Sequence, residues 1–176
     1  MNKREIDREL SLVKNGDNAA FERLYLATRR GVYSFLFTYF DSREDTEDAL
    51  QTVFLKIKKN ISKYNVGTNG LAWILQIAKN TALTEIEKSK SKQTAVLDDN
   101  LKTDDFSERK DERNDVLAAM KRSLTEEEQR IISLYAVFGY KHREIAKMLG
   151  VPTGTVTSKY KRAIDKLKNE LKEDGI

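Results

Sequence analysis

Residues 124–171 read LTEEEQRIISLYAVFGYKHREIAKMLGVPTGTVTSKYKRAIDKLKNEL, and this stretch decides the fold of the second half of the chain. Thr125 and Glu128 have the spacing of a capping box, in which each side chain bonds the other residue's backbone N–H, so we expect a helix to begin here. Gly139 is expected to end that helix, because glycine readily adopts a positive φ. The predicted apolar stripe of this helix, at helical spacing, is Ile131, Leu134, Tyr135 and Phe138.

Two more helices are predicted after it, a short one from about residue 141 and a last one over residues 153–171. The turn between them, Gly150-Val151-Pro152, is tight and contains a glycine, and two helices joined in this way form a helix-turn-helix. The short helix is expected to bury Ile145, Met148 and Leu149. The last helix is expected to bury one side made of Val156, Tyr160, Ala163, Leu167 and Leu171.

The opposite side of the last helix is polar. Hydroxyls near its start, followed by cations one and two turns later, suit a helix that enters the major groove of DNA, where the tip reads base edges and the cations meet phosphates. Over residues 141–172, nine Lys and Arg stand against three acids, a net charge of +6. The alternative is a solvated amphipathic helix that closes a small bundle. The candidate DNA contacts are Thr153, Thr155, Ser158, Lys159, Arg162 and Lys166.

Three strings in this stretch, residues 124–130, 139–146 and 149–159, resemble region 4 of the extracytoplasmic-function (ECF) sigma factors of RNA polymerase. The resemblance implies that the helix-turn-helix binds the minus-thirty-five element of a promoter through the residues just named. It also implies that this part of the chain docks on the β flap of the polymerase.

Composition excludes several other classes of function. The chain has 176 residues, no Cys and one His (His142), so a zinc finger, a disulfide framework or a nucleophile–base pair is not expected, and neither is a metal or other cofactor. No run of about 18 apolar residues exists, so we expect no membrane span. The charged N-terminus does not resemble a signal peptide. These features predict a soluble, helical, cytoplasmic protein.

The first half of the chain predicts four helices, over residues 3–14, 18–40, 42 to about 60 or 63, and 71–88. Asp17 is placed to cap the second helix and Ser42 the third, and Gly31 is a point where the second could bend. Residues 65–70 form a loop because they hold two Gly and two Asn. The acids that open the third helix favour its positive dipole end, which explains them better than a metal site does. Predicted core residues are Ile6, Leu10, Val13, Leu50, Val53, Phe54, Ile57, Ile61, Trp73, Ile74, Ile77, Ala78 and Leu83.

Residues 16–25 and 47–55 resemble region 2 of the ECF sigma factors. The second string is similar to the surface that docks on the clamp helices of the polymerase β′ subunit. The resemblance implies polymerase contacts at Asp48, Gln51, Thr52 and Leu55, whereas the family often has an acid at the position of Thr52. Without the resemblance, these residues indicate only an exposed helix face.

Residues 73–80 resemble the part of region 2 that opens the minus-ten element and captures a flipped base of the non-template strand. Capture of a single strand needs a pocket, flat side chains and cations near the backbone. The candidates for this role are Asn65, Thr68, Asn69, Lys79 and Asn80. Trp73 suits the core better than a stacking platform. The sequence departs from the family at Thr84, where Asp is common, and near Glu87, where Arg is common, so the family's contacts at these two positions are not carried over.

Residues 89–113 have the polar composition of a linker. The resemblance implies that the linker threads toward the polymerase active site, and a simple tether is equally compatible with its composition. The predicted fold is therefore all-α, with two small helical domains joined by a flexible linker: residues 1–88 for core polymerase and the minus-ten element, and residues 114–176 for the minus-thirty-five element.

The sequence patterns bear on three classes of function. The leading hypothesis is an ECF sigma factor that directs core RNA polymerase to promoter DNA and starts strand opening, without being an enzyme itself. The main alternative is a stand-alone helix-turn-helix regulator that binds duplex DNA. A nuclease would need a metal or nucleophile constellation, and the sequence offers none. An anti-sigma factor is a further partner that the resemblance suggests, although nothing in the sequence indicates its identity. The promoter sequence and the inducing signal are likewise not encoded in any pattern that we can read.

Overall fold

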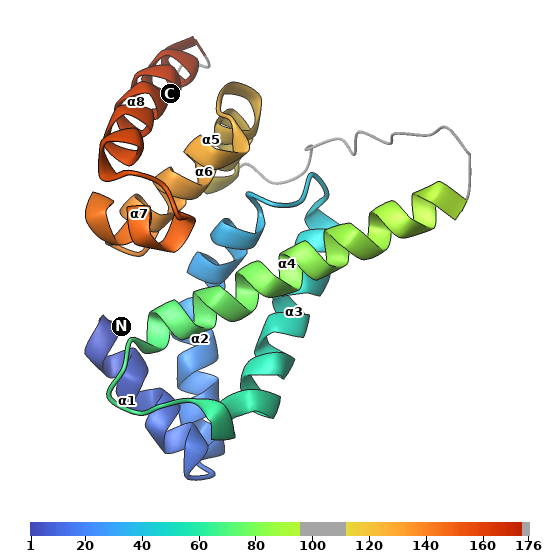
Figure 1. Ribbon diagram of the computed structural model, residues 1–176, viewed down its shortest axis with the longest axis vertical. Helices are drawn as coiled ribbons and strands as arrows, with labels where there is room; N and C mark the ends of the chain where they lie inside the picture. Colours follow the sequence, from blue (N-terminus) through green and yellow to red (C-terminus); the bar gives the residue numbers. More distant parts are fainter. Residues whose placement is uncertain (96–111, 174–176) are drawn as a thin grey trace. The chain divides into compact units, whose positions relative to one another are not determined.

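The computed structural model describes residues 1–95 and 112–173. It divides the chain into two compact units, residues 1–102 and 103–176 (Figure 1). All regular secondary structure in the described residues is helical. The predicted all-α fold with two helical domains is therefore confirmed.

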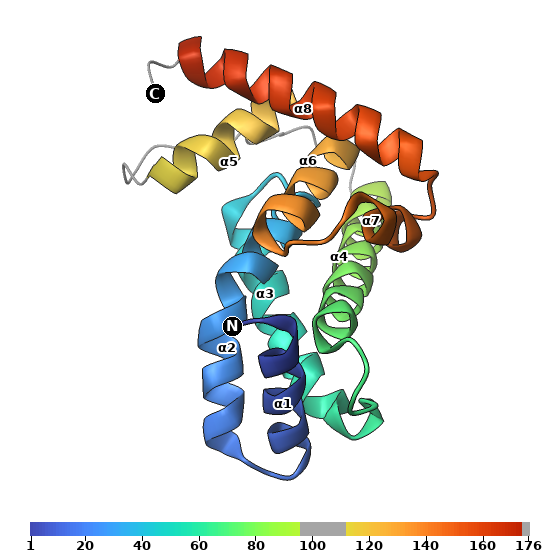
Figure 2. The same cartoon turned by 90° about the vertical axis from the view of Figure 1, so that its left-hand side faces the viewer.

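The first unit consists of α1 (Lys3–Lys14), α2 (Asn18–Leu36), α3 (Arg43–Asn60) and α4 (Gly70–Ala95), with a single 3₁₀ turn at Ile61–Lys63. Helix α4 packs against each of the other three, and α1 lies along α2 (Figure 2). Apolar side chains from all four helices fill the core, among them Leu10, Leu24, Leu36, Val53, Ile57, Ile74 and Leu75. This burial is what stabilises a bundle of this kind.

The predicted helix starts in this unit are confirmed. The Asp17 carboxylate accepts a hydrogen bond from the Ala20 backbone N–H at 3.0 Å, and the Ser42 hydroxyl accepts one from the Asp45 N–H at 3.1 Å. Each cap satisfies a backbone donor that the first turn of a helix leaves without a partner. Gly31 lies within α2 and does not interrupt it.

Two helix ends differ from the prediction. Helix α2 ends at Leu36 rather than near residue 40, because the chain turns there and buries Phe37 and Phe40. Helix α4 continues past residue 88 to Ala95. The added turns contain no Gly or Pro to stop them, and Lys88 pairs with Glu85 one turn away. The rest of the predicted linker, residues 96–111, lies outside the described residues.

The prediction that Leu83 belongs to the core is wrong, because its side chain is 43% exposed. The buried face of α4 instead runs through Ile74, Leu75, Ala78 and Ala82, which turns Leu83 toward solvent. Trp73 and Ile77 flank this face and are half-buried.

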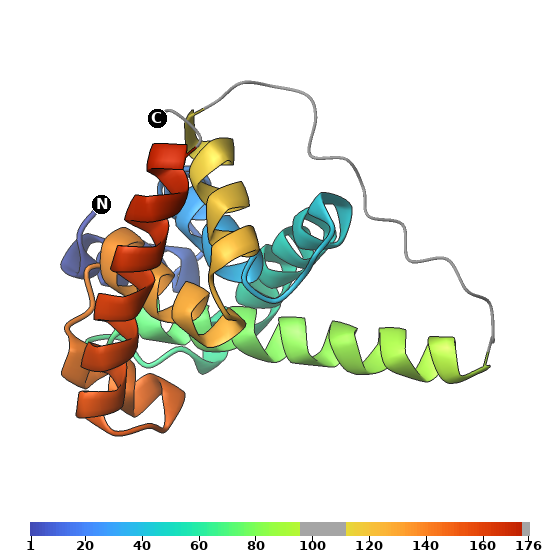
Figure 3. The ribbon, with the colours of Figure 1, turned by 90° about the horizontal axis from the view of Figure 1, so that it is seen from above.

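The second unit consists of α5 (Glu112–Ser123), α6 (Glu126–Ile132), α7 (His142–Leu149) and α8 (Thr153–Glu173), with a π-helical turn at Ser133–Val137. Helix α8 packs against α5, α6 and α7, and Figure 3 shows α5 lying beside it. A cluster of buried side chains joins α5, α6 and α8: Ala119, Met120, Leu124, Ile132, Ala163 and Leu167.

The predicted capping box of α6 and both glycine stops are confirmed. The Thr125 and Glu128 side chains each bond the other residue's backbone N–H. Gly139 and Gly150 have φ values of 64° and 72°, in the left-handed region where an L side chain is strained. These local signals fix where the helices of the helix-turn-helix begin and end.

The apolar stripe predicted after Thr125 is right only for its first half. Ile131 and Leu134 are buried, but Tyr135 is 41% exposed, and the neighbouring Val137 is 50% exposed. The π-helical turn explains the difference, since its wider turn shifts the following side chains away from the face that helical spacing predicts.

Candidate nucleic-acid and protein interfaces

The first turns of α8 carry the side chains that the sequence assigned to base reading. Thr153 is exposed at the first helical position, and Thr155 is half-buried two residues later. Ser158 is exposed, and its hydroxyl donates to the Thr155 carbonyl at 3.0 Å. Arg162 is exposed one turn further on and pairs with no carboxylate in the described part of the chain. These four side chains are therefore available to a ligand that meets the start of α8.

Lys159 and Lys166, the other two candidates on α8, are not free cations. The Lys159 ammonium donates to the Glu127 carboxylate, and the Lys166 ammonium lies 2.9 Å from a carboxylate oxygen of Glu128. The two lysines are seven residues apart and border the buried stripe of α8, so their ammonium groups reach carboxylates of α6, although the Lys166 side chain is still 43% exposed. The structure thus separates the predicted cation stripe into Arg162 and two residues whose ion pairs hold α8 against α6.

Glu128 is the centre of this attachment. Its residue is only 4% exposed, and its carboxylate serves both the capping box and Lys166. Burial raises the pKa of this carboxyl, but the hydrogen bonds from Lys166 and Thr125 outweigh burial and leave the pKa below its ordinary value. The carboxylate therefore stays ionised where it is needed to hold Lys166.

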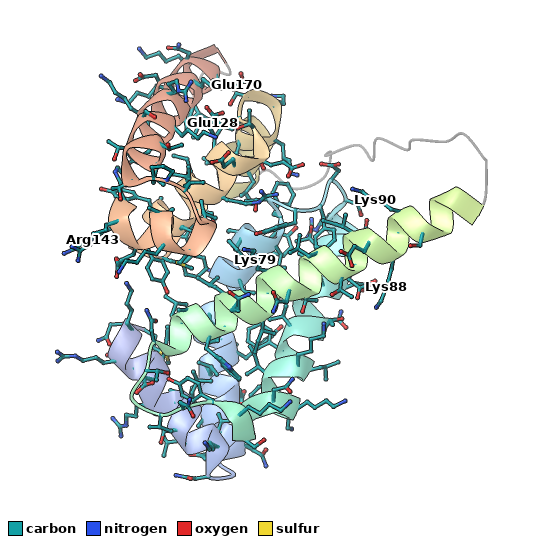
Figure 4. All side chains as sticks on the ribbon, in the orientation of Figure 1. Lys79, Lys88, Lys90, Glu128, Arg143 and Glu170 are labelled. Atoms are coloured by element: carbon teal, nitrogen blue, oxygen red, sulfur yellow. The ribbon has the colours of Figure 1, made fainter. Side chains whose placement is uncertain are left out.

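Three further exposed cations of α8 were not among the predicted DNA contacts. Lys161, Lys168 and Lys172 lie on its solvent side, together with Arg162. Helix α7 adds exposed Lys147 and Arg143, and Figure 4 shows Arg143 pointing away from its helix. Lys161 and Lys168 are seven residues apart, which places them on the same side of a helix, so this spacing could have predicted both as exposed cations. This side of the helix-turn-helix can bind a polyanion.

An aromatic cluster joins α7 to α8. The rings of Tyr135, His142 and Tyr160 lie with centroids 4.5–5.2 Å apart, and His142 Nδ1 is 3.1 Å from the Thr157 hydroxyl. Such ring contacts are worth about 1 kcal/mol each beyond the apolar area that they bury. The cluster fixes the angle at which the start of α8 leaves the turn, and no sequence pattern pointed to it.

One face of α3 collects the four side chains that the resemblance assigned to the polymerase. Positions 48, 51, 52 and 55 follow helical spacing, so they lie on one side of the helix. Asp48 and Gln51 are exposed, and Thr52 is half-buried. Leu55 is 69% exposed. A leucine this exposed beside polar side chains can serve as the apolar centre of a protein contact.

The loop before α4 brings Asn65, Thr68 and Asn69 together, all three of them exposed. The Thr68 hydroxyl donates to the Asn65 carbonyl at 2.7 Å, and the Asn69 side chain caps α4 by accepting from the Ala72 N–H at 3.1 Å. Because helices rise 1.5 Å per residue, Lys79 and Asn80 lie about 15 Å further along α4. The five candidates therefore form two separate groups rather than one.

The second of these groups is on the outer side of α4. Asn80 is exposed and accepts from the Gln76 side-chain amide at 2.9 Å. Lys79 is half-buried on the first half of the helix, well before Lys88 and Lys90 (Figure 4). Trp73, between the two groups, lies over the Tyr64 ring with centroids 5.1 Å apart. A half-buried aromatic ring between a loop and a polar helix face can contact an unstacked base.

Within residues 1–95 and 112–173 no group of three or more His, Asp or Glu is arranged to hold a metal ion. In the same residues, no helix combines the length and the apolar character needed to cross a bilayer.

Comparison with protein-family models gives two matches. The model of sigma-70 region 2 matches residues 24–92, and that of sigma-70 region 4 matches residues 114–167. The first match begins six residues into α2 and ends three residues before the end of α4, and the second runs from the first turn of α5 through most of α8.

Curated relatives give the same result. The ECF RNA polymerase sigma factor SigM of Mycobacterium tuberculosis is 27% identical over 148 residues, which cover 84% of this chain and 75% of the relative. SigK of the same species is 25% identical over 95% of this chain and 94% of its own. SigX of Bacillus subtilis is 23% identical, with 89% of both chains covered.

Two solved structures share the fold. CnrH in complex with the cytosolic domain of CnrY superposes with a TM-score of 0.67 at 18% identity, over 97% of this chain and 99% of its own. The sigma factor RpoE of Bartonella quintana, in complex with the anti-sigma factor NepR, gives 0.65 at 20% identity, over 86% and 96% of the two chains.

Proposed function

Because the chain belongs to the ECF sigma factors of RNA polymerase, we propose that its two units divide the work of promoter recognition between them. The observation that carries this proposal is that each unit matches one sigma-70 region, with region 2 first and region 4 second. In this proposal residues 1–88 bind core polymerase and the minus-ten element, residues 114–176 bind the minus-thirty-five element, and residues 89–113 connect them. The chain is an initiation factor, and the polymerase supplies the chemistry.

The polymerase contact is assigned to the exposed face of α3. Leu55 supplies apolar area, while Asp48, Gln51 and Thr52 surround it with polar groups, as in the rim and core of a protein interface. The proposed partner of this face is the pair of β′ clamp helices. A second contact, between the region 4 unit and the β flap, follows from the family resemblance alone.

The minus-ten contact is assigned to the loop residues Asn65, Thr68 and Asn69, with Lys79 and Asn80 as a second group along α4. The exposed amides and hydroxyl can bond to the edges of unpaired bases, and Lys79 can meet the strand's phosphates. Their separation along α4 is about 15 Å, so one extended strand can contact both groups.

The minus-thirty-five contact is assigned to the start of α8. Thr153, Thr155 and Ser158 are placed to meet base edges, and Arg162 to bind a guanine or a phosphate. Lys159 and Lys166 can reach DNA only by leaving Glu127 and Glu128, so we assign them a smaller share of the binding energy. Lys161 and Lys168 are added as phosphate contacts.

Two weak contacts on one chain reinforce each other. Once one unit is bound, the other is held at a high effective concentration near its own element, so the pair selects promoters whose two elements are correctly spaced. Since the polymerase works in the cytoplasm, we place the chain there. The Bartonella quintana relative is bound to an anti-sigma factor, and we propose the same class of regulator for this chain.

Transcription of fragmented genomic DNA from the chain's own organism tests the proposal. Core polymerase lacking any other sigma factor is supplied with the purified chain, and the 5′ ends of the transcripts are mapped. We expect starts that share two short upstream motifs at a fixed spacing. The proposal would be contradicted if adding the chain neither increased the number of transcripts nor concentrated their 5′ ends at particular sites, compared with core polymerase alone. That result would favour a stand-alone DNA-binding regulator.

A further inference from the structure

The loop that carries Asn65, Thr68 and Asn69 begins and ends at buried residues. Tyr64, just before it, is among the most deeply buried side chains of the first unit, and Gly70, just after it, is buried at the first position of α4. The residues between them are exposed. Both buried ends lie against α1, a helix at least fifty residues earlier in the chain.

One carboxylate of α1 holds two points of this loop. The Tyr64 hydroxyl donates to one oxygen of Asp7, and the Gly67 backbone N–H donates to the other at 3.2 Å. Gly67 has a φ of +85°, so the chain reverses there in a conformation that an L side chain would resist. Asp7 therefore ties the buried start of the loop to its exposed turn.

Two further contacts from α1 complete the attachment. The Lys14 ammonium donates to the Tyr64 carbonyl at 2.7 Å. At Gly70, an added Cβ would lie only 2.6 Å from Leu10 Cδ1 and 3.0 Å from the Tyr64 hydroxyl oxygen, so a side chain at this position would displace Leu10 of α1. Three residues of α1 (Asp7, Leu10 and Lys14) and Gly70 at the start of α4 thus fix where the loop leaves the core.

From this network we infer that Asp7 and Lys14 of α1 are positioning residues for promoter opening: they hold the loop before α4 in the conformation that receives the unpaired minus-ten strand. The inference rests on the proposed function, which assigns that strand to the loop. Neither side chain needs to touch DNA. A loop that is ordered before it binds pays less conformational entropy when the strand arrives, and its polar groups already point in the required direction.

The same network reaches the aromatic ring next to the loop. Tyr64 lies under Trp73, with ring centroids 5.1 Å apart, so a shift of Tyr64 also shifts the ring that can meet a base. Burial, together with the hydrogen bond to Asp7, raises the pKa of Tyr64 to about 12. Tyr64 thus stays protonated, and its hydroxyl remains a donor to Asp7, at every physiological pH.

The test compares Asp7→Ala, Lys14→Met and Tyr64→Phe with Arg8→Ala, which removes an exposed side chain of the same helix. Full-length variants are combined with core polymerase on a promoter mapped by the transcription experiment above, and strand opening is followed by permanganate reactivity of minus-ten thymines. Because a hydrogen bond to a charged group is worth about a factor of ten, we expect Asp7→Ala to lower the open fraction about tenfold. Affinity for core polymerase should be unchanged, and Arg8→Ala should behave as the parent chain.

Two spectroscopic signals separate positioning from a general loss of fold. Trp73 is the only tryptophan, so quenching of its fluorescence by acrylamide reports the packing beside the loop; Asp7→Ala should raise it and Arg8→Ala should not. In an alkaline titration followed at the tyrosinate absorbance, Asp7→Ala should move one tyrosine from the most alkaline part of the curve to lower pH. If Asp7→Ala fails to fold by circular dichroism, Tyr64→Phe carries the test, because it removes the hydroxyl and keeps the ring.

Asn65→Ala distinguishes failure of this inference from failure of the proposed function. If Asn65→Ala impairs opening while both Asp7→Ala and Tyr64→Phe open the promoter normally, the positioning inference is overturned and the function of the loop stands. If Asn65→Ala opens the promoter normally as well, the assignment of the loop to the minus-ten strand is overturned. Normal acrylamide quenching and normal tyrosine titration in Asp7→Ala would also overturn the inference, whatever the activity.

Discussion

The loop before α4 and the recognition helix α8 are both proposed to meet promoter DNA, but they are held in place by different forces. The loop is tied to α1 by hydrogen bonds around a buried tyrosine and by the tight packing of Leu10 against Gly70. Helix α8 is tied to α6 by two ion pairs, and to α7 by a cluster of aromatic rings. The loop is thus held by hydrogen bonds that converge on Tyr64 and Asp7, whereas α8 is held by two lysine–glutamate ion pairs and by ring contacts.

This difference has a consequence for DNA binding. DNA phosphates would compete with Glu127 and Glu128 for Lys159 and Lys166. Each of these lysines can therefore stabilise the fold or bind DNA, but binding DNA weakens its ion pair. At the loop, the side chains that hold the segment, those of Asp7, Lys14 and Tyr64, are not the ones offered to DNA, so the two tasks do not compete. The two regions should therefore respond differently to the same kinds of substitution.

The largest effect is expected for Glu128→Ala. It removes a nearly buried carboxylate that caps α6 and pairs with Lys166, so the second unit should lose about 2 to 3 kcal/mol of stability. Hydrogen–deuterium exchange of the α6 and α8 backbones measures the loss. Glu126→Ala, at an exposed carboxylate in the same turn, is the control and should cost less than about 0.5 kcal/mol. Equal costs for the two variants would show that the ion pair to α8 has no special role.

A pair of glycine substitutions gives the next largest effect. Gly70→Ala places a methyl group 2.6 Å from Leu10, so the first unit should lose about 2 kcal/mol. Gly154→Ala, in the first turn of α8, adds a methyl group in open space and should be neutral or stabilise its helix by about 0.5 kcal/mol. Urea unfolding followed by Trp73 fluorescence reports the first unit, and hydrogen exchange reports the second. A neutral Gly70→Ala would mean that α1 can move away from α4 at little cost.

Removing one cation at a time from α8 should sharpen the division between fold and DNA. Arg162→Ala should weaken binding to a minus-thirty-five duplex about tenfold and leave stability unchanged, because the side chain is exposed. Lys166→Ala should show the reverse, with a smaller loss of affinity and lower stability of the second unit. Fluorescence anisotropy at two salt concentrations, beside a thermal melt, measures both. If Lys166→Ala reduces affinity as much as Arg162→Ala does, the assignment of Lys166 to the fold is wrong.

The smallest effect expected is on pH dependence. The pKa of Glu128 is lower in the folded chain than in the unfolded one, so its contribution to stability is complete above the unfolded value of about 4.3 and is lost as pH falls through the folded value. The second unit should therefore weaken below about pH 4, and Glu128→Gln should make that decline shallower. Hydrogen exchange corrected for intrinsic rates, or denaturant unfolding at several pH values, measures how steeply the free energy of unfolding of the second unit falls with pH. An unchanged slope would contradict the pairing with Lys166.

Local signals predicted much of this fold. The caps at Asp17, Ser42 and Thr125 and the stop at Gly150 depend on neighbouring residues, so the sequence shows them directly. Helical spacing also predicted the buried side of α1 and the shared face of the α3 residues, because periodicity decides which side chains lie together.

Contacts between distant residues could not be read in the same way. The bond between Tyr64 and Asp7 spans 57 residues, and the pairing of Lys166 with Glu128 spans 38. Spacing within one helix placed Lys166 on the polar side of α8, but it could not predict that a carboxylate of α6 would pair with it. The π-helical turn after Ile132 changed the period itself, which is why Tyr135 was wrongly placed in the core stripe.

The measurement that tests the account most directly is size-exclusion chromatography of the purified chain with bacterial core RNA polymerase lacking any other sigma factor. The account predicts a stable one-to-one complex for the parent chain, and a much weaker one for the variant with Asp48→Ala and Gln51→Ala, which should keep its helical circular dichroism. Separate elution of the parent chain and the polymerase, together with tight binding of the free chain to duplex DNA, would contradict it.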